Sequence, residues 1–341
     1  MVFPRFNNVA IVALARDEAP DIMTSADIES WLAPAMRRLK LPHGLLASLT
    51  GIKQRRLYPA DYMPSQAAAA AVEKLFAKSQ VSREAVDILY STSVCRDHIE
   101  PSTASIVQNR TGLGAKVKSL DIGSACLGFI DGMELAAISI ESGLSDYALI
   151  VAGENSRPIL NRTCEIILSP DGDRAMFFRN FATLTLGSGG TAMLLGRRDK
   201  HPGSPYLVAS VSQSDACSNH LCRGDAEGME TDSAALLNAG VALALRTFNL
   251  GKENFGWKPD SFARLISHQV SASNTKKLCE TLGLDEGILV KTFPEYGNMG
   301  PAAVPFTLDL ADEQGLIKPG DRLCLMGIGS GLCCSMMEVV W

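Results

Sequence analysis

The chain has 341 residues, of which 46% are hydrophobic and 20% are charged. This is enough apolar sequence for one large domain, or two fused ones, with a substantial buried core. The formal net charge of −5 at pH 7 argues against a nucleic acid partner, because nucleic-acid-binding proteins present a basic surface. No cluster of lysines marks a membrane-binding surface either.

The N-terminal stretch contains a short apolar run at residues 9–15, with Arg5 before it and acidic residues soon after it. This pattern predicts a strand, because a secretory signal has a basic start, a longer apolar centre and a small-residue cleavage site. No run approaches the roughly 18 apolar residues of a membrane-spanning helix. We therefore expect a cytoplasmic protein without an integral membrane segment.

The nine cysteines are an odd number, which in an unsecreted chain favours reduced thiols. In the stretch "CSNHLC", Cys217, His220 and Cys222 lie close together and resemble half of a metal site. The sequence offers no second half, so we interpret the stretch as a loop with incidental thiols and expect no metal.

Strand-like and helix-like runs alternate along the chain, which predicts an α/β protein. Several strands are continuously apolar, so both faces of their sheets should be covered. The predicted strands are residues 9–14, 88–93, 119–123, 148–152, 184–186, 192–195, 265–269 and 322–327, and the predicted helices are residues 64–80, 128–143, 233–250 and 274–284.

The order of these elements suggests two similar halves, each running strand, helix, special turn, helix, strand. A repeat this long predicts an internal duplication about a pseudo-twofold axis, because solenoid repeats are much shorter. We place the halves at residues 1–178 and 179–341, with functional groups of both meeting in one crevice. Residues 164–179 and 213–232 are expected to be loops outside the core, where partner contacts or a substrate channel are built.

The stretch "SLDIGSACLGFIDGM" places Cys126 where a strand ends and a helix begins. The first turn of a helix favours the thiolate, which is the nucleophilic form. The small residues at 123–125 leave room for a substrate. A cysteine in such a setting is nevertheless more often a small core residue than a nucleophile, so Cys126 needs partners.

Two other polar residues stand at similar junctions. His268, in "LISHQVSASN", ends an apolar strand, and Asn298, in "PEYGNMGPAAVP", lies in a glycine-rich turn before a helix. Alone, the histidine reads as a hydrogen-bonded structural residue and the asparagine as a turn residue. Together with Cys126 they form a Cys, His and Asn set that could face one crevice, which favours nucleophilic catalysis.

Three stretches resemble the motif regions of condensing enzymes of the 3-oxoacyl-acyl-carrier-protein synthase III type. They are "DIGSACLGFIDGMELAAISIESG", "ISHQVSASNTKKLCETLGL" and "YGNMGPAAVPFTLDLADEQGLIKPGDRLCLMGIGSG". "TGIKQRRLY" and "LGSGGTAMLL" resemble further motifs of that family, so the similarity extends over nearly the whole chain. The resemblance implies a thiolase fold, which is a duplicated five-layer α-β-α-β-α architecture.

Within that superfamily the chain is most similar to the OleA type, which joins two fatty acyl-CoA molecules head to head. The matching stretches are "STSVCRDHIEPSTASIVQ", "GNMGPAAVP" and "LMGIGSGLCCSMMEVVW". After Asn298 the synthase III pattern has small hydroxylated residues, whereas this chain has Met299, Gly300 and Pro301. That departure disfavours a malonyl-ACP substrate.

The resemblance also implies roles for individual residues. Cys126 takes the first acyl chain as a thioester, and the backbone N–H groups of Cys126 and Gly331 hold the oxyanion. His268 and Asn298 bind the carbonyl oxygen of the second acyl-CoA. Glu100 is the base that removes the α-proton, supplied across a homodimer interface, although the residues alone favour a helix-start charge there. Coenzyme A thioesters are the substrates, and no cofactor is implied.

Several alternatives stay open. The run "KQRR" gives Lys53, Arg55 and Arg56, which either meet the phosphates of coenzyme A or form a solvated patch. The "GSGG" run at 187–190 fits no phosphate-binding pattern and is read as tight structural backbone. The activity itself could instead be that of a decarboxylating synthase III, or of an acyltransferase to an alcohol or amine. A non-catalytic partner subunit would lack part of the Cys, His and Asn set, which is intact here.

Overall fold

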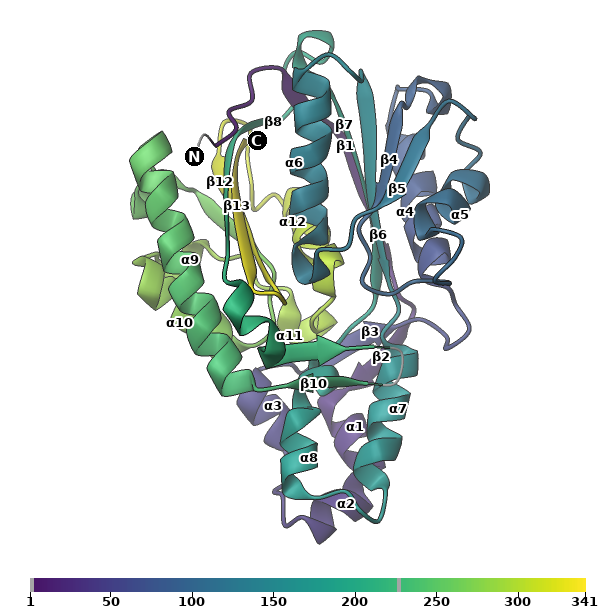
Figure 1. Ribbon diagram of the computed structural model, residues 1–341, viewed down its shortest axis with the longest axis vertical. Helices are drawn as coiled ribbons and strands as arrows, with labels where there is room; N and C mark the ends of the chain where they lie inside the picture. Colours follow the sequence, from purple (N-terminus) through teal and green to yellow (C-terminus); the bar gives the residue numbers. More distant parts are fainter. Residues whose placement is uncertain (1–2, 226–227) are drawn as a thin grey trace.

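Nine strands form the centre of the fold in the computed structural model, which describes residues 3–225 and 228–341 (Figure 1). Strands β1 and β8 pair through Ala10 and Tyr206, so two sheets are joined there. The first sheet contains, in order, β1 (Val9–Glu18), β7 (Gly189–Arg197), β6 (Tyr147–Glu154), β4 (Ile88–Ser91) and β5 (Lys118–Asp121). The second contains β8 (Tyr206–Ser214), β13 (Cys333–Val340), β12 (Arg322–Gly329) and β11 (Arg264–Ser267).

Helices cover both faces of each sheet, as the apolar strands predict. Helices α6 (Gly128–Glu141) and α12 (Ala303–Glu313) pack between the two sheets in the largest core cluster. Helices α4 (Pro64–Lys78) and α5 (Thr103–Arg110) cover the outer face of the first sheet, and α9 (Ser233–Phe255) and α10 (Ala272–Leu282) cover that of the second. This confirms the predicted five-layer α-β-α-β-α architecture of the thiolase fold (Figure 1).

Two glycines let α4 lie directly on the first sheet. A Cβ atom at Gly153 on β6 would meet the carbonyl oxygen of Pro64 at 2.0 Å, and one at Gly190 on β7 would meet that of Ala67 at 2.2 Å. Because no side chain fits there, the helix approaches the strands at backbone distance. The reading of residues 187–190 as tight structural backbone is therefore confirmed at Gly190.

A smaller module lies below the sheets in Figure 1 and packs around its own apolar cluster. The prediction of loops at 164–179 is wrong, because helices α7 (Arg157–Leu168) and α8 (Arg174–Arg179) occupy most of that stretch and bury Cys164, Ile167 and Phe177. Residues 184–186, predicted as a strand, belong to the 3-10 helix η3 and its end. The elements of this region are α1 (Ser25–Trp31), α2 (Ala33–Arg38), α3 (Leu45–Thr50), α7 (Arg157–Leu168), α8 (Arg174–Arg179), α11 (Phe293–Tyr296), β2 (Asp21–Thr24), β3 (Gln54–Leu57), β9 (Cys222–Gly224), β10 (Met229–Thr231) and η3 (Phe181–Thr185).

The remaining 3-10 helices are short connections. They are η1 (Arg83–Ala85), η2 (Ala125–Leu127), η4 (Arg198–Lys200), η5 (Ala216–Leu221), η6 (Pro259–Ser261), η7 (Glu286–Ile288) and η8 (Gly300–Ala302). The predicted loop at 213–232 contains η5 and the β9–β10 hairpin, and residues 226–227 of it lie outside the described chain.

The division of the chain after residue 178 does not coincide with the division of the sheets. Strand β7, which that boundary assigns to the second half, pairs antiparallel with both β1 and β6 of the first sheet. The strands of the first sheet therefore extend along the chain to Arg197, where β7 ends, and the second sheet begins with β8.

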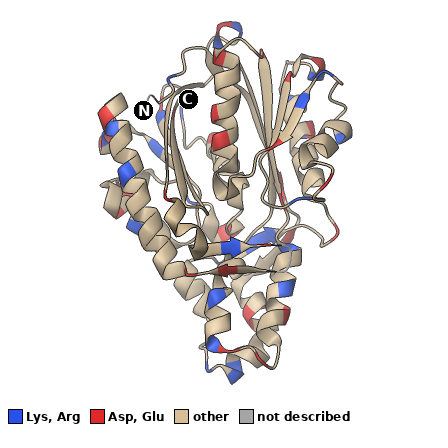
Figure 2. Cartoon of the chain, viewed as in Figure 1, with Lys and Arg blue, Asp and Glu red and all other residues tan. Residues whose placement is uncertain are grey.

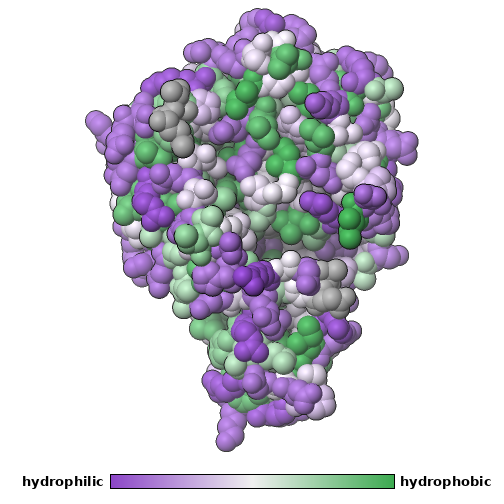
Figure 3. All heavy atoms as spheres, in the orientation of Figure 1, coloured by the Kyte–Doolittle hydropathy of each residue, from purple (hydrophilic) through white to green (hydrophobic). Residues whose placement is uncertain are grey.

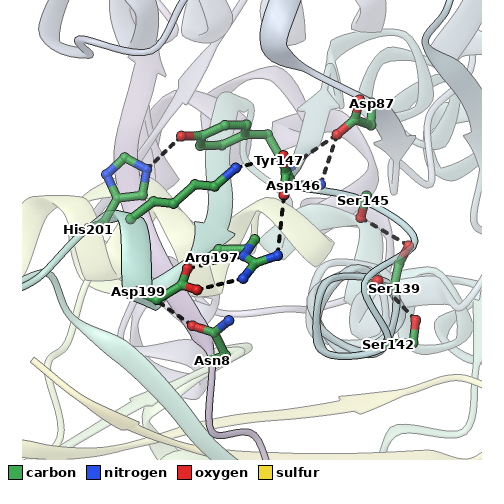
Figure 4. A network of polar contacts seen from close by, with 11 residues as sticks. Asn8, Asp87, Ser139, Ser142, Ser145, Asp146, Tyr147, Arg197, Asp199 and His201 are labelled. Carbon is green, nitrogen blue, oxygen red and sulfur yellow. Dashed lines mark hydrogen bonds and ion pairs between the residues drawn. The ribbon is translucent and has the colours of Figure 1, made fainter.

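A polar network lies at the start of β6, at the opposite end of the strand from Glu154 (Figure 4). Asp87 accepts hydrogen bonds from the backbone N–H groups of Asp146 and Tyr147, at 2.9 and 3.2 Å. Tyr147 Oη lies 2.9 Å from His201 Nε2. These contacts fix the start of β6, so the strand is held firmly at the end away from the cavity described below.

Basic and acidic residues are interspersed along the chain in Figure 2. One described helix, α9, is long and apolar enough to cross a membrane by length and composition alone. Its buried residues, among them Leu243 and Phe248, pack in the core cluster of the second sheet. The helix therefore fills the role of a core helix.

Candidate active site

Cys126 stands in a tight turn between a strand and a helix, as the sequence predicts. Strand β5 ends at Asp121, and η2 carries the cysteine into the first turn of α6. Ala125 has a φ of +47°, a left-handed conformation that residues other than glycine rarely adopt and that concentrates at functional sites. Both Ala125 and Cys126 line a large cavity.

The carboxylate of Asp131 on α6 holds this turn in place. It accepts hydrogen bonds from the Ser124 hydroxyl and, at 3.0 Å, from the Ser335 hydroxyl on β13. Burial raises the pKa of Asp131, and both hydrogen bonds oppose that rise. The turn that carries the cysteine is thus tied to a strand of the second sheet.

Burial determines the charge state of the Cys126 thiol. Its removal from water raises the pKa of Cys126 to about 12, and the charge of Glu154 adds to the rise. The sequence analysis expected the helix start to favour the thiolate, but here desolvation outweighs that effect. The resting nucleophile is therefore a protonated thiol, and attack requires a group that accepts its proton.

His268 and Asn298 are brought together as the sequence predicts. His268 Nε2 lies 2.9 Å from Asn298 Oδ1. Burial lowers the pKa of His268, although the contact with Asn298 opposes the shift, so the imidazole is neutral at pH 7. Asn298 Oδ1 also accepts from the Gly300 N–H at 3.0 Å. The amide Nδ2 is therefore the donor that Asn298 can offer to a substrate.

The backbone around Asn298 is fixed on both sides. Its N–H donates to the Thr185 carbonyl at 2.9 Å, and its carbonyl accepts from the Gly187 N–H at 2.8 Å. The preceding Gly297 has a φ of +70°, and a Cβ there would lie 2.8 Å from the Thr185 carbonyl oxygen. Only glycine fits this turn, which sets the direction of the asparagine side chain.

Cys126, His268 and Asn298 all line one cavity of about 1270 Å³. Its volume exceeds the roughly 300–1,000 Å³ of a typical small-ligand pocket. Much of its wall is apolar and comes from α7, α9 and η3, including Ile159, Phe181, Leu236, Leu237 and Val241. Such a wall suits long acyl chains. Ser330 and Leu332 line the cavity on either side of Gly331, whose role in an oxyanion hole stays a prediction.

Glu100 lies outside the cavity of its own chain. Its neighbours His98 and Ile99 line that cavity, but Glu100 is exposed and is not among the described lining residues. Ile99 is 93% exposed, so the segment projects from the surface. This placement leaves Glu100 free to reach a second molecule.

The three basic residues predicted to meet coenzyme A are separated by the structure. Arg55 is 1% exposed and donates to the Leu184 carbonyl at 2.9 Å. A side chain so enclosed reaches neither a solvent-side phosphate nor a solvated patch, so both readings are wrong for Arg55. Lys53 and Arg56 approach Glu295 and Glu18 at 3.7 and 3.9 Å. Neither lines the described part of the Cys126 cavity.

The stretch that resembled half of a metal site forms part of the cavity rim and an adjoining loop. His220 Nδ1 lies 3.1 Å from the Cys217 carbonyl oxygen, and Cys222 Sγ lies 3.5 Å from Thr231 Oγ1. Within residues 3–225 and 228–341, no group of three or more His, Cys, Asp or Glu residues is arranged to hold a metal ion.

Sequence reasoning gave no role to Glu154 or Cys95, which both line the cavity. Glu154 is 5% exposed. Burial raises its pKa to about 7, although hydrogen bonds from Val94 and Cys95 act to lower it. The signal was present, because a lone carboxylate follows the apolar run 148–152. Strand ends that meet a cavity are frequent places for functional side chains.

Comparisons with known proteins agree with this geometry. Residues 120–216 match the family described as 3-oxoacyl-[acyl-carrier-protein] synthase III, and residues 253–341 match its C-terminal domain. The chain is 40% identical to an acyl-CoA:acyl-CoA alkyltransferase of Xanthomonas campestris, over 98% of this chain and 99% of that protein. It is 34% identical to one of Shewanella oneidensis, over 99% of this chain and all of that protein.

Solved structures are similar over the same length. Cerulenin-bound OleA of Xanthomonas campestris superposes with a TM-score of 0.97 at 40% identity, covering 99% of this chain and 98% of that one. A variant of the same OleA with bound lauric acid and lauroyl-CoA gives a TM-score of 0.96, covering 98% and 100%. The chain therefore belongs to the 3-oxoacyl-acyl-carrier-protein synthase III family of thiolase-fold acyltransferases.

Proposed function

We propose that this enzyme joins two fatty acyl-CoA molecules by a non-decarboxylating Claisen condensation, through an acyl thioester on Cys126, to give a β-keto product. The observation that carries the proposal is the convergence of Cys126, His268 and Asn298 on one largely apolar cavity. The full-length similarity to two acyl-CoA:acyl-CoA alkyltransferases supports it. Coenzyme A thioesters are the substrates, and no cofactor takes part.

The first half-reaction transfers an acyl group. The Cys126 sulfur attacks the thioester carbonyl, its proton passes to neutral His268, and the carbon–sulfur bond to coenzyme A breaks. The departing thiolate takes up the proton and leaves as the free thiol. Backbone N–H groups of Cys126 and Gly331 stabilise the oxyanion.

The second half-reaction forms the carbon–carbon bond. Glu100 of a neighbouring subunit removes an α-proton from the second acyl-CoA, and donors on His268 and Asn298 stabilise the enolate oxygen. The α-carbon then attacks the acyl carbonyl on Cys126, and the Cys126 sulfur leaves as the thiolate and takes up the proton released from the α-carbon. Because the nucleophilic carbon arises by deprotonation, no carbon dioxide is released.

A homodimer completes this site. Strand β5 lies at the edge of the first sheet, where an unpaired strand can bind another chain. Exposed apolar side chains lie on this strand and on α6, namely Leu120, Leu135 and Ile138. Apolar residues gather over α6 in Figure 3. Contact through this face suits an exposed Glu100 that acts on a second molecule.

The reduced state of the cysteines supports a cytoplasmic location. All nine are free thiols, as expected where glutathione and thioredoxin keep cysteines reduced. Acyl-CoA substrates are also metabolites of that compartment.

The proposal is tested by incubating the purified enzyme with myristoyl-CoA alone. We expect free coenzyme A and a β-keto product derived from two acyl chains. Product that appears only with malonyl-ACP, together with carbon dioxide, would establish the decarboxylating synthase III activity, which the name of the matched family favours. Product that requires an added alcohol or amine would establish acyl transfer instead.

A further inference from the structure

Glu154 is a buried carboxylate that takes no part in the two half-reactions. It ends β6 and lies on the cavity wall together with Cys126. Its Oε1 accepts a hydrogen bond from the Val94 N–H at 2.7 Å, and its Oε2 accepts one from the Cys95 N–H at 3.2 Å. Each oxygen thus binds one of two successive backbone donors.

These two hydrogen bonds fix the start of residues 94–100, which we call the base loop because it ends at Glu100. Farther along the loop, Asp97 accepts from the Ser65 N–H and hydroxyl at 2.9 and 2.5 Å. After these two anchors the loop projects to exposed Ile99. The place of Glu100 therefore depends on how firmly the loop is held at its base.

We propose that Glu154 is a positioning residue for the condensation. Its carboxylate holds the base loop in place and thereby orients Glu100 of the same chain toward the cavity of a neighbouring subunit. The inference rests on the proposed function, because Glu100 is needed only when an α-proton must be removed. Glu154 itself touches no substrate in this scheme.

A carboxylate is suited to this task because both of its oxygens accept hydrogen bonds. A glutamine offers one acceptor, and its NH₂ group would face the second backbone N–H. In a protonated carboxyl, one oxygen likewise carries a hydrogen and would face the second backbone N–H. Since burial raises the pKa of Glu154 to about 7, the paired hydrogen bonds are complete above that pH and are weakened below it.

Among the described residues, the titratable groups that interact with Glu154 are the thiols of Cys95 on the base loop and Cys126 on the η2 turn. Burial raises the pKa of both thiols, so both are neutral at pH 7. Glu154 is therefore the member of this group that changes charge near neutral pH. We expect the condensation rate to fall as the pH drops through about 7, while acylation of Cys126 falls less.

The variant Glu154→Gln separates positioning from a general structural role. We expect acylation of Cys126, measured as the mass increase of the intact protein, to be nearly unchanged. Formation of the β-keto product should fall about 10²-fold, which a misplacement of about 1 Å can cause, and the change near pH 7 should disappear. Glu154→Asp keeps the charge and should recover part of the rate. Equal loss of both half-reactions, or an unchanged condensation rate, would overturn the proposal.

Glu29 provides a matched control. It too is 5% exposed and accepts two backbone N–H bonds, from Gly44 and Leu46 at 2.7 and 2.8 Å, but it does not line the described cavity. Glu29→Gln should lower the melting temperature at least as much as Glu154→Gln does. Only Glu154→Gln should lower the condensation rate while leaving acylation of Cys126 nearly unchanged.

Mixed dimers show through which chain Glu154 acts. Co-expressed Glu154→Gln and Cys126→Ala subunits, purified with two different tags, form one site with an intact cysteine and an intact base loop from the partner. That dimer should regain condensation. If Glu154 instead acted on Cys126 of its own chain, neither site would be whole, and absence of recovery would refute the proposal.

A wild-type enzyme that makes no β-keto product from acyl-CoA alone would overturn the proposed function and this inference together. If the wild type and Glu154→Gln form the product equally well, this inference alone is overturned.

Discussion

His268 Nε2 and Asn298 Oδ1 lie 2.9 Å apart although 30 positions separate the residues in the chain. The contact joins the end of β11 to the turn before η8, so the two side chains form a single unit on the cavity wall. A unit of this kind can hold one carbonyl oxygen from two directions. Its loss should therefore affect the step in which that oxygen becomes charged.

Asn298→Ala should spare acylation of Cys126 more than condensation. Loss of one donor to a developing oxyanion typically lowers the rate by about 10²–10³-fold, and here that charge develops on the second acyl-CoA. Coenzyme A release in the first turnover and β-keto product in the steady state measure the two steps. His268→Ala should lower condensation similarly and should also slow acylation, because His268 accepts the Cys126 proton in the first half-reaction. In condensation the double variant should lose less than the sum of both losses in free energy, because the residues act as a unit. Equal loss of acylation and condensation in Asn298→Ala would indicate a structural role for Asn298 instead.

Cys126→Ala should abolish both covalent acylation and product formation, because the thioester forms on that sulfur. Intact-protein mass spectrometry after incubation with acyl-CoA measures the first effect directly. Cys95→Ala is the matched control, since Cys95 lines the same cavity and burial also raises its pKa. That variant should still be acylated. An acyl adduct that persists in Cys126→Ala would place the nucleophile on another residue.

Burial of Cys126 predicts an unusual pH dependence of its alkylation. Because the pKa of Cys126 is raised to about 12, the thiolate fraction should increase about tenfold per pH unit from pH 7 to pH 10, without a plateau. Peptide mass spectrometry after timed exposure to iodoacetamide follows this residue, with exposed Cys217 as an internal comparator. A plateau near pH 7 would show that the helix start stabilises the thiolate more than burial destabilises it.

The sequence predicted those parts of the fold that have a clear periodicity. Helices α4, α6, α9 and α10 and most strands of the two sheets follow continuous apolar or amphipathic runs. Strands β8 and β13 were not predicted, because serine and cysteine in them weaken the apolar pattern. They are strands because they pair with each other and because β13 also pairs with β12. Helices α7 and α8 were missed because Pro170 and Gly172 between them suggested a loop.

For the site, the sequence predicted the residues that stand at element junctions. Cys126, His268 and Asn298 each follow a strand or precede a helix, so a topological argument could bring them together. Arg55 was misplaced because its neighbours in "KQRR" are polar, whereas β3 alternates and turns Arg55 inward to the Leu184 carbonyl. The task of Glu154 was not visible, because it depends on Val94 and Cys95, which are 60 and 59 positions away.

Glu100→Gln decides which reaction the enzyme catalyses. The change keeps the shape of the side chain and removes the base, so acylation of Cys126 should continue while the β-keto product falls about 10²–10⁴-fold, the usual contribution of a general base. Coenzyme A release from the first acyl group, followed together with product, distinguishes the two steps.

Exposure of Glu100 outside the cavity of its own chain makes the same variant a test of the dimer. Co-expressed Glu100→Gln and Cys126→Ala subunits would give one complete site per mixed dimer, built from the cysteine of one chain and the base of the other, and activity should return to about half of the wild-type value if the two sites work independently. Each variant alone, assayed at the same total concentration, is the control. Full condensation by the Glu100→Gln homodimer would exclude this residue as the base. If that homodimer is inactive and the mixed dimer remains so, Glu100 must act within its own chain, through a movement of the base loop that carries the carboxylate from the surface to the cavity.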